Sequence, residues 1–318
     1  MSLYTWFAKF IKLTIDGEKY ERIIADDDVY DVSNICPTCG VNGERKPIWK
    51  VQSNPLVEFL YCPACRGVSA SKMPTDEYLY SYYKNYYVED DKKITFFGDV
   101  GRFARHIVRY TPFSNERNKI RILDFGGGDG SVAKEVANII LANNPNVENV
   151  LIVLVDYQKQ EYYHNDAIEF IRMESLDEVD HNFDIIIASA ILEHIPVLNS
   201  TMQKLLSLID CGGYLYVRVP YIMPFKRIFR NIPLLYPMHV HDLGPSFWNR
   251  IIERYNFNGT ILSSRPPLPE TEFKTHFFYT LLSHLFKIPA FIELIVRNRP
   301  KDMIWNYVAG WEIVVKKI

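Results

Sequence analysis

Short continuous runs of apolar residues alternate with helical patterns along the second half of the chain. Val150–Asp156 and Phe183–Ala190 are too apolar for half-exposed strands, and such runs are typical of parallel strands covered by helices on both faces. Helical patterns at Ser131–Ala142 and Leu198–Ile209 separate them. We therefore predict an α/β fold with a mostly parallel sheet. Its strands are expected at Arg121–Phe125, Val150–Asp156, Ile168–Arg172, Phe183–Ala190, Gly213–Val219, Thr260–Ser264 and Tyr307–Val315.

The N-terminal part of the chain has a different character. Residues 31–70 combine two cysteine pairs with Pro, Gly and Asn, which favours short strands and turns, and residues 74–110 are helical and rich in Tyr. The first 30 residues carry no pattern that assigns them. We predict an N-terminal module at 1–73, a Tyr-rich helical bridge at 74–118, and the α/β domain at 119–318 with helical lid insertions at about 221–237 and 266–304.

Composition adds limits on the class of protein. With 318 residues, 48% of them hydrophobic, the chain can bury one large core and a smaller one. The formal charge of −2 gives no broad electrostatic reason to expect nucleic acid or anionic lipid as a partner. No secretion signal and no apolar run of spanning length is visible, so we expect a soluble, cytoplasmic protein.

A glycine-rich loop follows the first strand of the α/β domain. Gly126, Gly128 and Gly130 alternate with other residues directly between a predicted strand, which ends in Asp124-Phe125, and a predicted helix. Glycines let a ligand approach the backbone, and the helix N-terminus offers unpaired N–H groups. Such loops also serve nucleotides and ordinary turns, so the loop indicates a binding site without naming the ligand.

An acidic residue ends the next strand. The carboxylate of Asp156 is placed to accept two hydrogen bonds from a ribose diol, and Tyr157 could lie against an adenine ring. The alternative is a turn or helix-capping role for Asp156. A dinucleotide-binding fold uses similar parts, but its G-x-G-x-x-G spacing does not fit, because the last glycine here comes one residue too soon. Asp124 ahead of the first glycine is typical of methyltransferases.

Four motifs in order resemble one family. Leu123–Gly130 resembles motif I of class I S-adenosylmethionine-dependent methyltransferases, Asp156 its ribose-binding acid, Phe183–His194 its fourth-strand motif, and Cys211–Val217 its turn into the fifth strand. The resemblance covers about residues 119–265. It implies a Rossmann-like, seven-stranded class I methyltransferase sheet and S-adenosylmethionine as cofactor. The cofactor-binding residues that it implies are Asp124, Gly126, Gly128, Gly130, Asp156, Tyr157, Glu174, Ser175 and Ser189, with Met173 as the alternative to the third-strand pair.

The cysteines point to a metal. Cys36-Pro-Thr-Cys39 and Cys62-Pro-Ala-Cys65 are two pairs with the spacing that lets each clasp one side of a tetrahedral ion. Four thiolates leave no open position, so we predict a structural Zn²⁺ bound by Cys36, Cys39, Cys62 and Cys65. Disulfides or inert core thiols are the alternatives. One irregularity is that Gly follows Cys39 directly but follows Cys65 only after Arg66.

The cysteine module narrows the resemblance. Together with Met73–Leu79 and the tyrosines that follow, it resembles a bacterial subgroup with a zinc knuckle ahead of the methyltransferase domain. Genes of that subgroup often accompany surface-polysaccharide or natural-product synthesis. Sugar C-methyltransferases share a comparable module but carry a further Rossmann-like domain, which this sequence does not extend into, so their exact reaction is not expected here.

Catalytic candidates lie after the fourth and fifth strands. His194 follows the fourth strand at the carboxyl edge, where open α/β sheets bind ligands, and could act with Glu193 on the acceptor's proton. His239 and His241 lie in a loop that resembles the acceptor-facing loop of the family. The alternatives are local packing or burial; a second metal site is not expected, because only Asp242 adjoins the two histidines.

Two further features admit more than one interpretation. Tyr83, Tyr86 and Tyr87 could roof the cofactor pocket, although tyrosines at helical spacing more often serve packing. The insertions at 221–237 and 266–304 mix apolar and basic residues, which fits lids, a peripheral membrane contact, extra packing or a dimer contact.

The leading hypothesis is a methyltransferase that acts on a small molecule or a glycan precursor (a sugar, nucleotide-sugar or lipid-linked saccharide). An RNA methyltransferase is the enzymatic alternative, but the near-neutral charge and the lack of a basic stripe beside the cysteines count against nucleic acid. A non-catalytic protein that binds S-adenosylmethionine is the other alternative.

Overall fold

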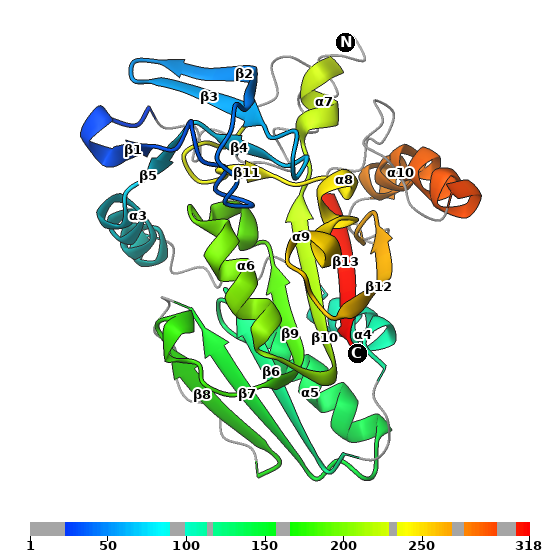
Figure 1. Cartoon of the computed structure of the whole chain (residues 1–318). Coiled ribbons are helices and arrows are strands. Elements are labelled where there is room, and N and C mark those ends of the chain that lie inside the picture. Colours follow the sequence, from blue (N-terminus) through cyan, green and yellow to red (C-terminus); the bar gives the residue numbers. More distant parts are fainter. Residues whose placement is uncertain are drawn as a thin grey trace.

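A computed structural model describes residues 23–89, 99–112, 117–156, 166–228, 234–268, 277–297 and 310–318. Two parts dominate it. One is a large sheet with helices on both faces, and the other is a smaller sheet beyond one end of the large sheet (Figure 1).

The large sheet has seven strands in the order β12-β13-β10-β9-β6-β7-β8. The pairs β10–β9, β9–β6, β6–β7 and β7–β8 are parallel, whereas β13 runs antiparallel to both β10 and β12. One reversed strand next to the edge of an otherwise parallel sheet is the class I methyltransferase arrangement, so the predicted fold class is confirmed. The strands are β6 (Lys119–Phe125), β7 (Asn149–Val155), β8 (Ile168–Met173), β9 (Phe183–Ser189), β10 (Ile209–Pro220), β12 (Gly259–Arg265) and β13 (Gly310–Lys317).

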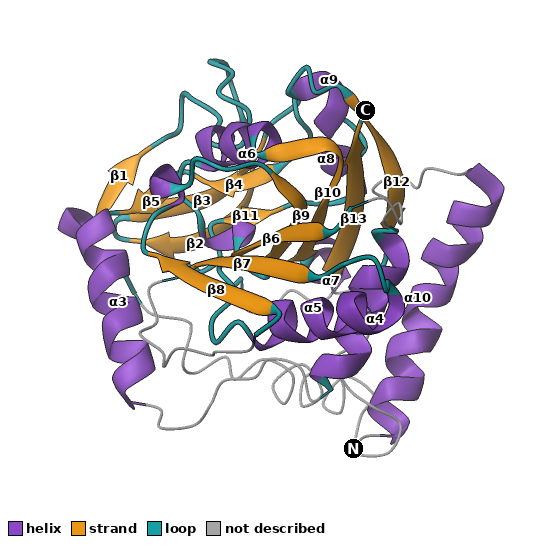
Figure 2. Ribbon diagram, turned by 90° about the horizontal axis from the view of Figure 1, so that it is seen from below, coloured by secondary structure: helices purple, strands orange, loops and turns teal. Residues whose placement is uncertain are grey.

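Helices cover both faces of this sheet (Figure 2). On one face α4 (Val100–Tyr110) and α5 (Ser131–Asn143) pack over a core that includes Ile122, Val136 and Ile152. On the other lie α6 (Leu198–Ser207), α8 (Pro245–Trp248) and α9 (Ile251–Arg254). Burial on both faces explains why the central strands are apolar along their whole length.

The N-terminal strands form a small sheet and a separate two-stranded one. In the small sheet β2 (Lys46–Ser53), β3 (Leu56–Tyr61) and β4 (Val68–Ala70) pair in sequence. The two-stranded sheet pairs β1 (Val29–Asp31), which follows the short helix η1 (Asp26–Asp28), with β5 (Lys72–Pro74). A segment from the large domain, β11 (His241–Asp242), completes the small sheet by pairing with β4, His241 opposite Ser69. The loop after β10 is therefore fixed between the two sheets.

One hydrophobic core joins the cysteine module to the large sheet. It runs without a break from Cys36, Phe59 and Met73 to Leu205 and Trp311. The two parts therefore share a core on both sides of residue 73. The domain boundary at that residue stays a prediction.

The predicted helical bridge consists of two helices in the described residues. α3 (Asp76–Glu89) lies beside the small sheet, and α4 packs under the large one. In the two insertions, the described helices are α7 (Met223–Ile228) and α10 (Phe277–Arg297). Among the helices described, none combines the length and the apolarity needed to cross a membrane.

A buried polar cluster ties α4 to the edge of the sheet. Glu312 of β13 bonds to His106 at 2.9 Å and to Arg265 Nε at 2.5 Å, and it accepts the hydroxyl of Tyr216 at 3.1 Å. Burial alone would raise the pKa of Glu312, but the bond to His106 and the charge of Arg265 hold it below its usual value. A buried carboxylate that is paired in this way stabilises one arrangement of these elements.

Candidate functional site

The four predicted cysteines converge on one buried point. All four ligand sulfurs lie within 4.8 Å of one another; the sulfurs of Cys36 and Cys65 are 3.8 Å apart, and those of Cys39 and Cys62 are 3.9 Å apart. A tetrahedral ion with Zn–S bonds of about 2.3 Å sets its sulfurs about 3.8 Å from each other, whereas a disulfide needs about 2.05 Å. The residues fit a structural zinc ion, and all four cysteines are free of disulfides.

The surroundings of the sulfurs also suit a thiolate site. The Thr38 hydroxyl lies 2.9 Å from the sulfur of Cys36 and 3.1 Å from that of Cys65. Arg45, only 5% exposed, donates to Ser69 at 2.6 Å. Burial lowers the pKa of Arg45, and the negative charge of three of the thiolates opposes that shift. A buried cation next to a four-thiolate shell offsets part of its negative charge.

The two cysteine turns have the same backbone shape despite the irregular glycine. The residue after each pair has a positive φ, 70° at Gly40 and 62° at Arg66. Its N–H donates to the carbonyl of the first cysteine of the pair, at 2.7 Å and 2.8 Å. The second turn therefore accepts a left-handed non-glycine residue, at a modest conformational cost.

The glycine loop lies between β6 and α5, as predicted. The N–H of Gly128 donates to the Asp156 carboxylate at 2.8 Å, which joins the loop to the end of β7. Gly127 lies so close to Asp124 that a Cβ there would come within 2.2 Å of the Asp124 carboxyl carbon. No role was predicted for Gly127 from the sequence; its requirement comes from this contact, which only the folded loop shows.

Asp124 is a buried carboxyl group under this loop. It is 3% exposed, and its Oδ2 has no hydrogen-bond partner in the described structure. Burial, followed by the charges of Asp156 and Asp129, raises the pKa of Asp124 to about 7. An acceptor left unused beneath a glycine cradle, next to the strand-end Asp156, fits a ligand that brings hydrogen-bond donors and positive charge, as S-adenosylmethionine does.

We expect Asp124→Asn to remove a pH dependence of stability. Because the folded pKa of about 7 lies above the unfolded value of 3.8, the wild type loses stability as the pH rises from about 4 through 7. The loss is on the order of 4 kcal/mol when ionisation is complete. The free energy of unfolding of the variant relative to wild type should therefore rise by up to this amount between pH 4 and pH 8, measured by urea denaturation without ligand. A difference that is the same at both pH values, or that matches the exposed Asp180→Asn control, would contradict the assignment.

The other predicted cofactor residues are placed as follows. Glu174 is exposed after β8, and the Ser175 hydroxyl caps the short helix η2 (Leu176–Glu178) by accepting from Asp177 at 3.1 Å. Ser189 ends β9, with its hydroxyl oxygen buried and unpartnered among the described atoms. Tyr157 lies outside the described residues. Their roles in binding the cofactor remain predictions.

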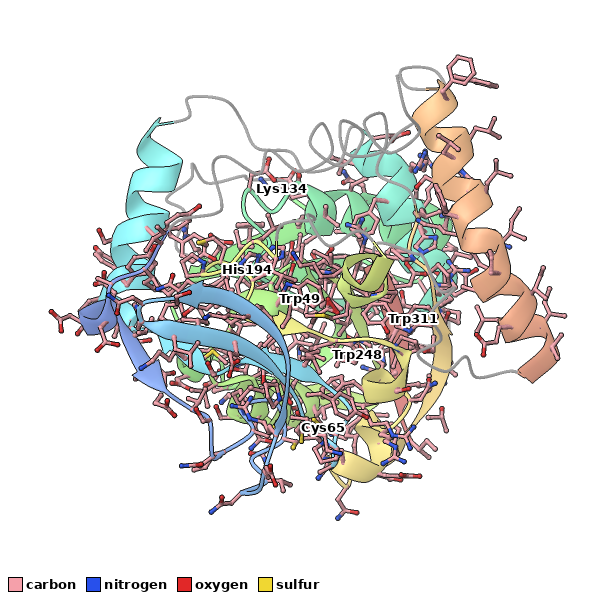
Figure 3. The ribbon with its side chains drawn as sticks, turned by 90° about the horizontal axis from the view of Figure 1, so that it is seen from above. Trp49, Cys65, Lys134, His194, Trp248 and Trp311 are labelled. Atoms are coloured by element: carbon pink, nitrogen blue, oxygen red, sulfur yellow. The ribbon has the colours of Figure 1, made fainter. Side chains whose placement is uncertain are left out.

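Three of the predicted catalytic residues meet at the carboxyl edge of the sheet. Glu193 and His194 lie in the short helix η3 (Leu192–His194) after β9, and His239 approaches from the loop before β11. The rings of His194 and His239 are 4.7 Å apart and nearly perpendicular, and Nε2 of His194 is 3.6 Å from Oε1 of Glu193. Figure 3 places His194 well apart from Cys65, so this cluster is separate from the cysteine site.

The fourth, His241, takes a different place. Its Nε2 bonds to the carbonyl of Ile195 at 2.7 Å, and burial lowers its pKa to about 4. It does not join the cluster of Glu193, His194 and His239, although His239 and His241 line one small cavity of about 10 Å³, enough for no more than one water. The neighbouring Asp242 accepts from the N–H groups of Ile222 and Met223 at the start of α7, a capping role.

Helix α3 reaches this cluster. The ring of Tyr83 lies 6.3 Å from that of His194, edge to face, and Tyr78 and Tyr82 stack on one another behind it. The side chains of Tyr86 and Tyr87 lie outside the described part. At Tyr83 the tyrosine pattern therefore serves both packing and contact with the candidate site.

Comparison with known proteins agrees with this architecture. A family model described as "Methyltransferase domain" matches residues 96–261, more than half of the chain. No curated protein sequence matches the chain.

Several solved structures are similar at low sequence identity. The plantazolicin methyltransferase BpumL, in complex with a desmethyl analogue and SAH, has a TM-score of 0.44 at 12% identity, covering 75% of this chain and 89% of that one. A putative methyltransferase in complex with the Haloferax volcanii Trm112 activator has 0.41 at 10%, covering 67% and 88%. The YcgJ protein from Bacillus subtilis has 0.39 at 15%, covering 68% and 98%. Similarity at this level does not define the acceptor of this chain.

The strand order, the glycine loop and the strand-end acid define a class I methyltransferase fold with a cysteine-built zinc site at its N-terminus. The chain belongs to the methyltransferase-domain family. The fold and the donor atoms at the two sites support S-adenosylmethionine and a structural zinc ion as its two bound groups.

Proposed function

We propose that this chain transfers a methyl group from S-adenosylmethionine to a small molecule or a glycan precursor, such as a sugar, nucleotide-sugar or lipid-linked saccharide. One observation carries the proposal: the cofactor loop and the Glu193–His194 segment are in direct contact. A Cβ at Gly126 would come within 2.4 Å of Ile191 Cγ1, and Ile191 is two residues ahead of Glu193. A methyl donor on the loop would thus lie beside groups able to act on an acceptor.

The chemistry asks little of the protein beyond this placement. S-adenosylmethionine supplies an electrophilic methyl group on a sulfonium. The Asp156 carboxylate is proposed to hold the ribose of its adenosine portion. The loop is proposed to pack against the cofactor, with Gly126, Gly128 and Gly130 allowing close approach. Glu193, His194 and His239 are proposed to orient the acceptor and to assist loss of its proton as the new bond to the methyl carbon forms.

The zinc module is proposed to cover the acceptor side. Its four thiolates close the coordination shell, so the ion has no position for a substrate. The backbone of Val240 donates to the carbonyl of Glu193 at 2.8 Å and accepts from the N–H of Ala70 in β4 at 2.9 Å. Val240 thus links the module directly to the acceptor-side cluster.

The acceptor class is tested by label transfer. The purified chain is incubated with methyl-labelled S-adenosylmethionine and a fractionated cell extract, with an Asp156→Ala variant as the background control. The proposal predicts label in the nucleotide-sugar or glycolipid fraction. Label in RNA or protein would refute it and would make the cysteine module a contact for a macromolecule.

We further propose a peripheral membrane contact through α10. The polar residues Thr280, Lys287 and Glu293 of this helix are buried against the protein, whereas apolar residues are exposed. Lys287 donates to the carbonyl of Pro267. Its exposed side carries no charge along most of its length of about 30 Å. The exposed apolar residues are Phe277, Phe278, Leu281, Leu285, Ile288, Phe291, Ile292, Ile295 and Val296.

Such a face would dock at a bilayer surface that presents a lipid-linked acceptor. We expect the chain to float with phospholipid vesicles and the double variant Ile295→Ser/Val296→Ser to remain in solution. Leu262→Ser, on the exposed side of β12, is the matched control and should still float. A concentration-dependent dimer that ignores vesicles would contradict the membrane contact.

A further inference from the structure

The cluster of Glu193, His194 and His239 has the composition of a metal site. Each residue offers one ligand atom, and the three atoms lie within 4.8 Å of one another. Two imidazoles and one carboxylate form a common donor set for divalent transition metals, and they leave further positions open. The set joins η3 to the loop before β11, so the chain builds it from two segments that are far apart in sequence.

The hydrogen bonds orient one imidazole as a ligand. Nδ1 of His194 is 3.0 Å from the carbonyl oxygen of Met238, which can only accept, so this nitrogen carries the proton. The lone pair of His194 is then on Nε2, on the side of Glu193. A ring N–H bound to a backbone carbonyl is the usual outer support of a metal-binding histidine.

The second imidazole also has a ligand atom to offer. Nδ1 of His239 is buried and has no hydrogen-bond partner among the described residues. The ring of His239 lies 4.7 Å from that of His194 and nearly perpendicular to it, and the ligand atoms of both rings lie within 4.8 Å of each other and of a Glu193 oxygen. Two imidazoles are therefore within reach of one ion.

The spacing of the cluster is close to that around a bound ion. The Glu193 side chain, which would supply the carboxylate oxygen, is 2% exposed. A shared ion with bonds of about 2.1 Å would hold its ligand atoms about 3 to 3.5 Å apart. His194 and Glu193, at 3.6 Å, are already close to this separation.

We propose that Glu193, His194 and His239 bind a divalent first-row transition-metal ion, distinct from the zinc held by the cysteines. Its open positions would take an oxygen of the acceptor and favour loss of that oxygen's proton to solvent. That oxygen then forms its bond to the methyl carbon while the carbon–sulfur bond breaks, with the electron pair remaining on sulfur. The ion site stands on the geometry alone; its part in methyl transfer rests on the proposed function.

Cobalt(II) is the probe, added to the full chain with zinc already bound by its cysteines. We expect one further cobalt ion per chain, with visible absorption but without the intense near-ultraviolet band of cobalt thiolates. This absorption should disappear in His239→Ala and in the near-isosteric Glu193→Gln, and persist in His181→Ala, which changes an exposed histidine. Affinity for S-adenosylmethionine, measured in the same samples, should stay unchanged.

Three results would contradict the proposed ion site. The proposal is overturned if the zinc-loaded wild type binds no cobalt, if cobalt appears only with thiolate bands, or if Glu193→Gln, folded as judged by circular dichroism, binds as much as wild type. Because the readout is metal binding, a chain that binds cobalt but transfers no methyl group would refute the proposed function and leave the ion site standing.

Discussion

Replacing Cys65 with serine is expected to release the zinc ion and to lower the melting temperature by at least about 10 °C. Structural zinc contributes its binding energy to folding, and a loss of several kcal/mol shifts the melting temperature of a domain this size by about 2–4 °C per kcal/mol. Cys65 is 1% exposed and belongs to the same continuous core as the large sheet. The loss should therefore reach beyond the cysteine turns.

The matched control for this change is Cys211→Ser. Cys211 is the one cysteine outside the two pairs, and it is exposed. Its replacement should leave both the zinc content, measured by mass spectrometry of the metal, and the melting temperature unchanged. A Cys65→Ser protein that keeps its full zinc content and melts with the wild type would show that the four sulfurs do not share an ion.

Asp156→Ala is expected to weaken binding of S-adenosylhomocysteine at least about 100-fold. Two hydrogen bonds from a ribose diol to a carboxylate contribute about 1.5–3 kcal/mol each, and every 1.4 kcal/mol is a factor of ten. The variant also loses the acceptor for the Gly128 N–H, so the loop becomes less ordered. Equilibrium dialysis with labelled ligand measures the affinity.

The control here is the exposed Asp180→Ala, which should bind as tightly as wild type. Circular dichroism and the melting temperature of Asp156→Ala establish that the sheet persists. A folded Asp156→Ala protein with wild-type affinity would mean that the cofactor lies elsewhere.

The large sheet could be predicted well from the sequence, because strands buried on both faces appear as continuous apolar runs. All seven predicted strands exist, with ends shifted by a few residues: β10 begins at Ile209 instead of Gly213, and β13 ends at Lys317 instead of Val315. Tyr307, where the last strand was predicted to begin, lies outside the described residues. Strand ends depend on hydrogen bonds to neighbours, which no local pattern contains.

The cysteine site was equally predictable, since the spacing of each pair already sets half of a tetrahedron. What local reasoning could not supply is the position of the small sheet. β11 has only two residues and no strand pattern of its own, and it pairs His241 with Ser69 and Asp242 with Val68. This pairing and the bonds of Val240 place the loop of His239 beside η3.

The same limit applies to the surroundings of His239. Asp242 was the acidic residue considered as a partner of His239 from the sequence, but it caps α7. The residues that the fold brings to His239 are Glu193 and His194. The cluster of His106, Arg265 and Glu312 could not be predicted either, because its residues are far apart in the sequence. Residues of this kind are found only when strand order is known, because their partners come from other strands and helices.

Calorimetric titration of S-adenosylmethionine into the zinc-loaded wild-type chain tests whether this chain binds the methyltransferase cofactor. We expect one molecule bound per chain and no binding of NAD under the same conditions, because the glycine loop and Asp156 suit a methyltransferase cofactor and not a dinucleotide. No heat with S-adenosylmethionine, or binding of NAD in its place, would contradict the assignment of this chain as an S-adenosylmethionine-dependent methyltransferase.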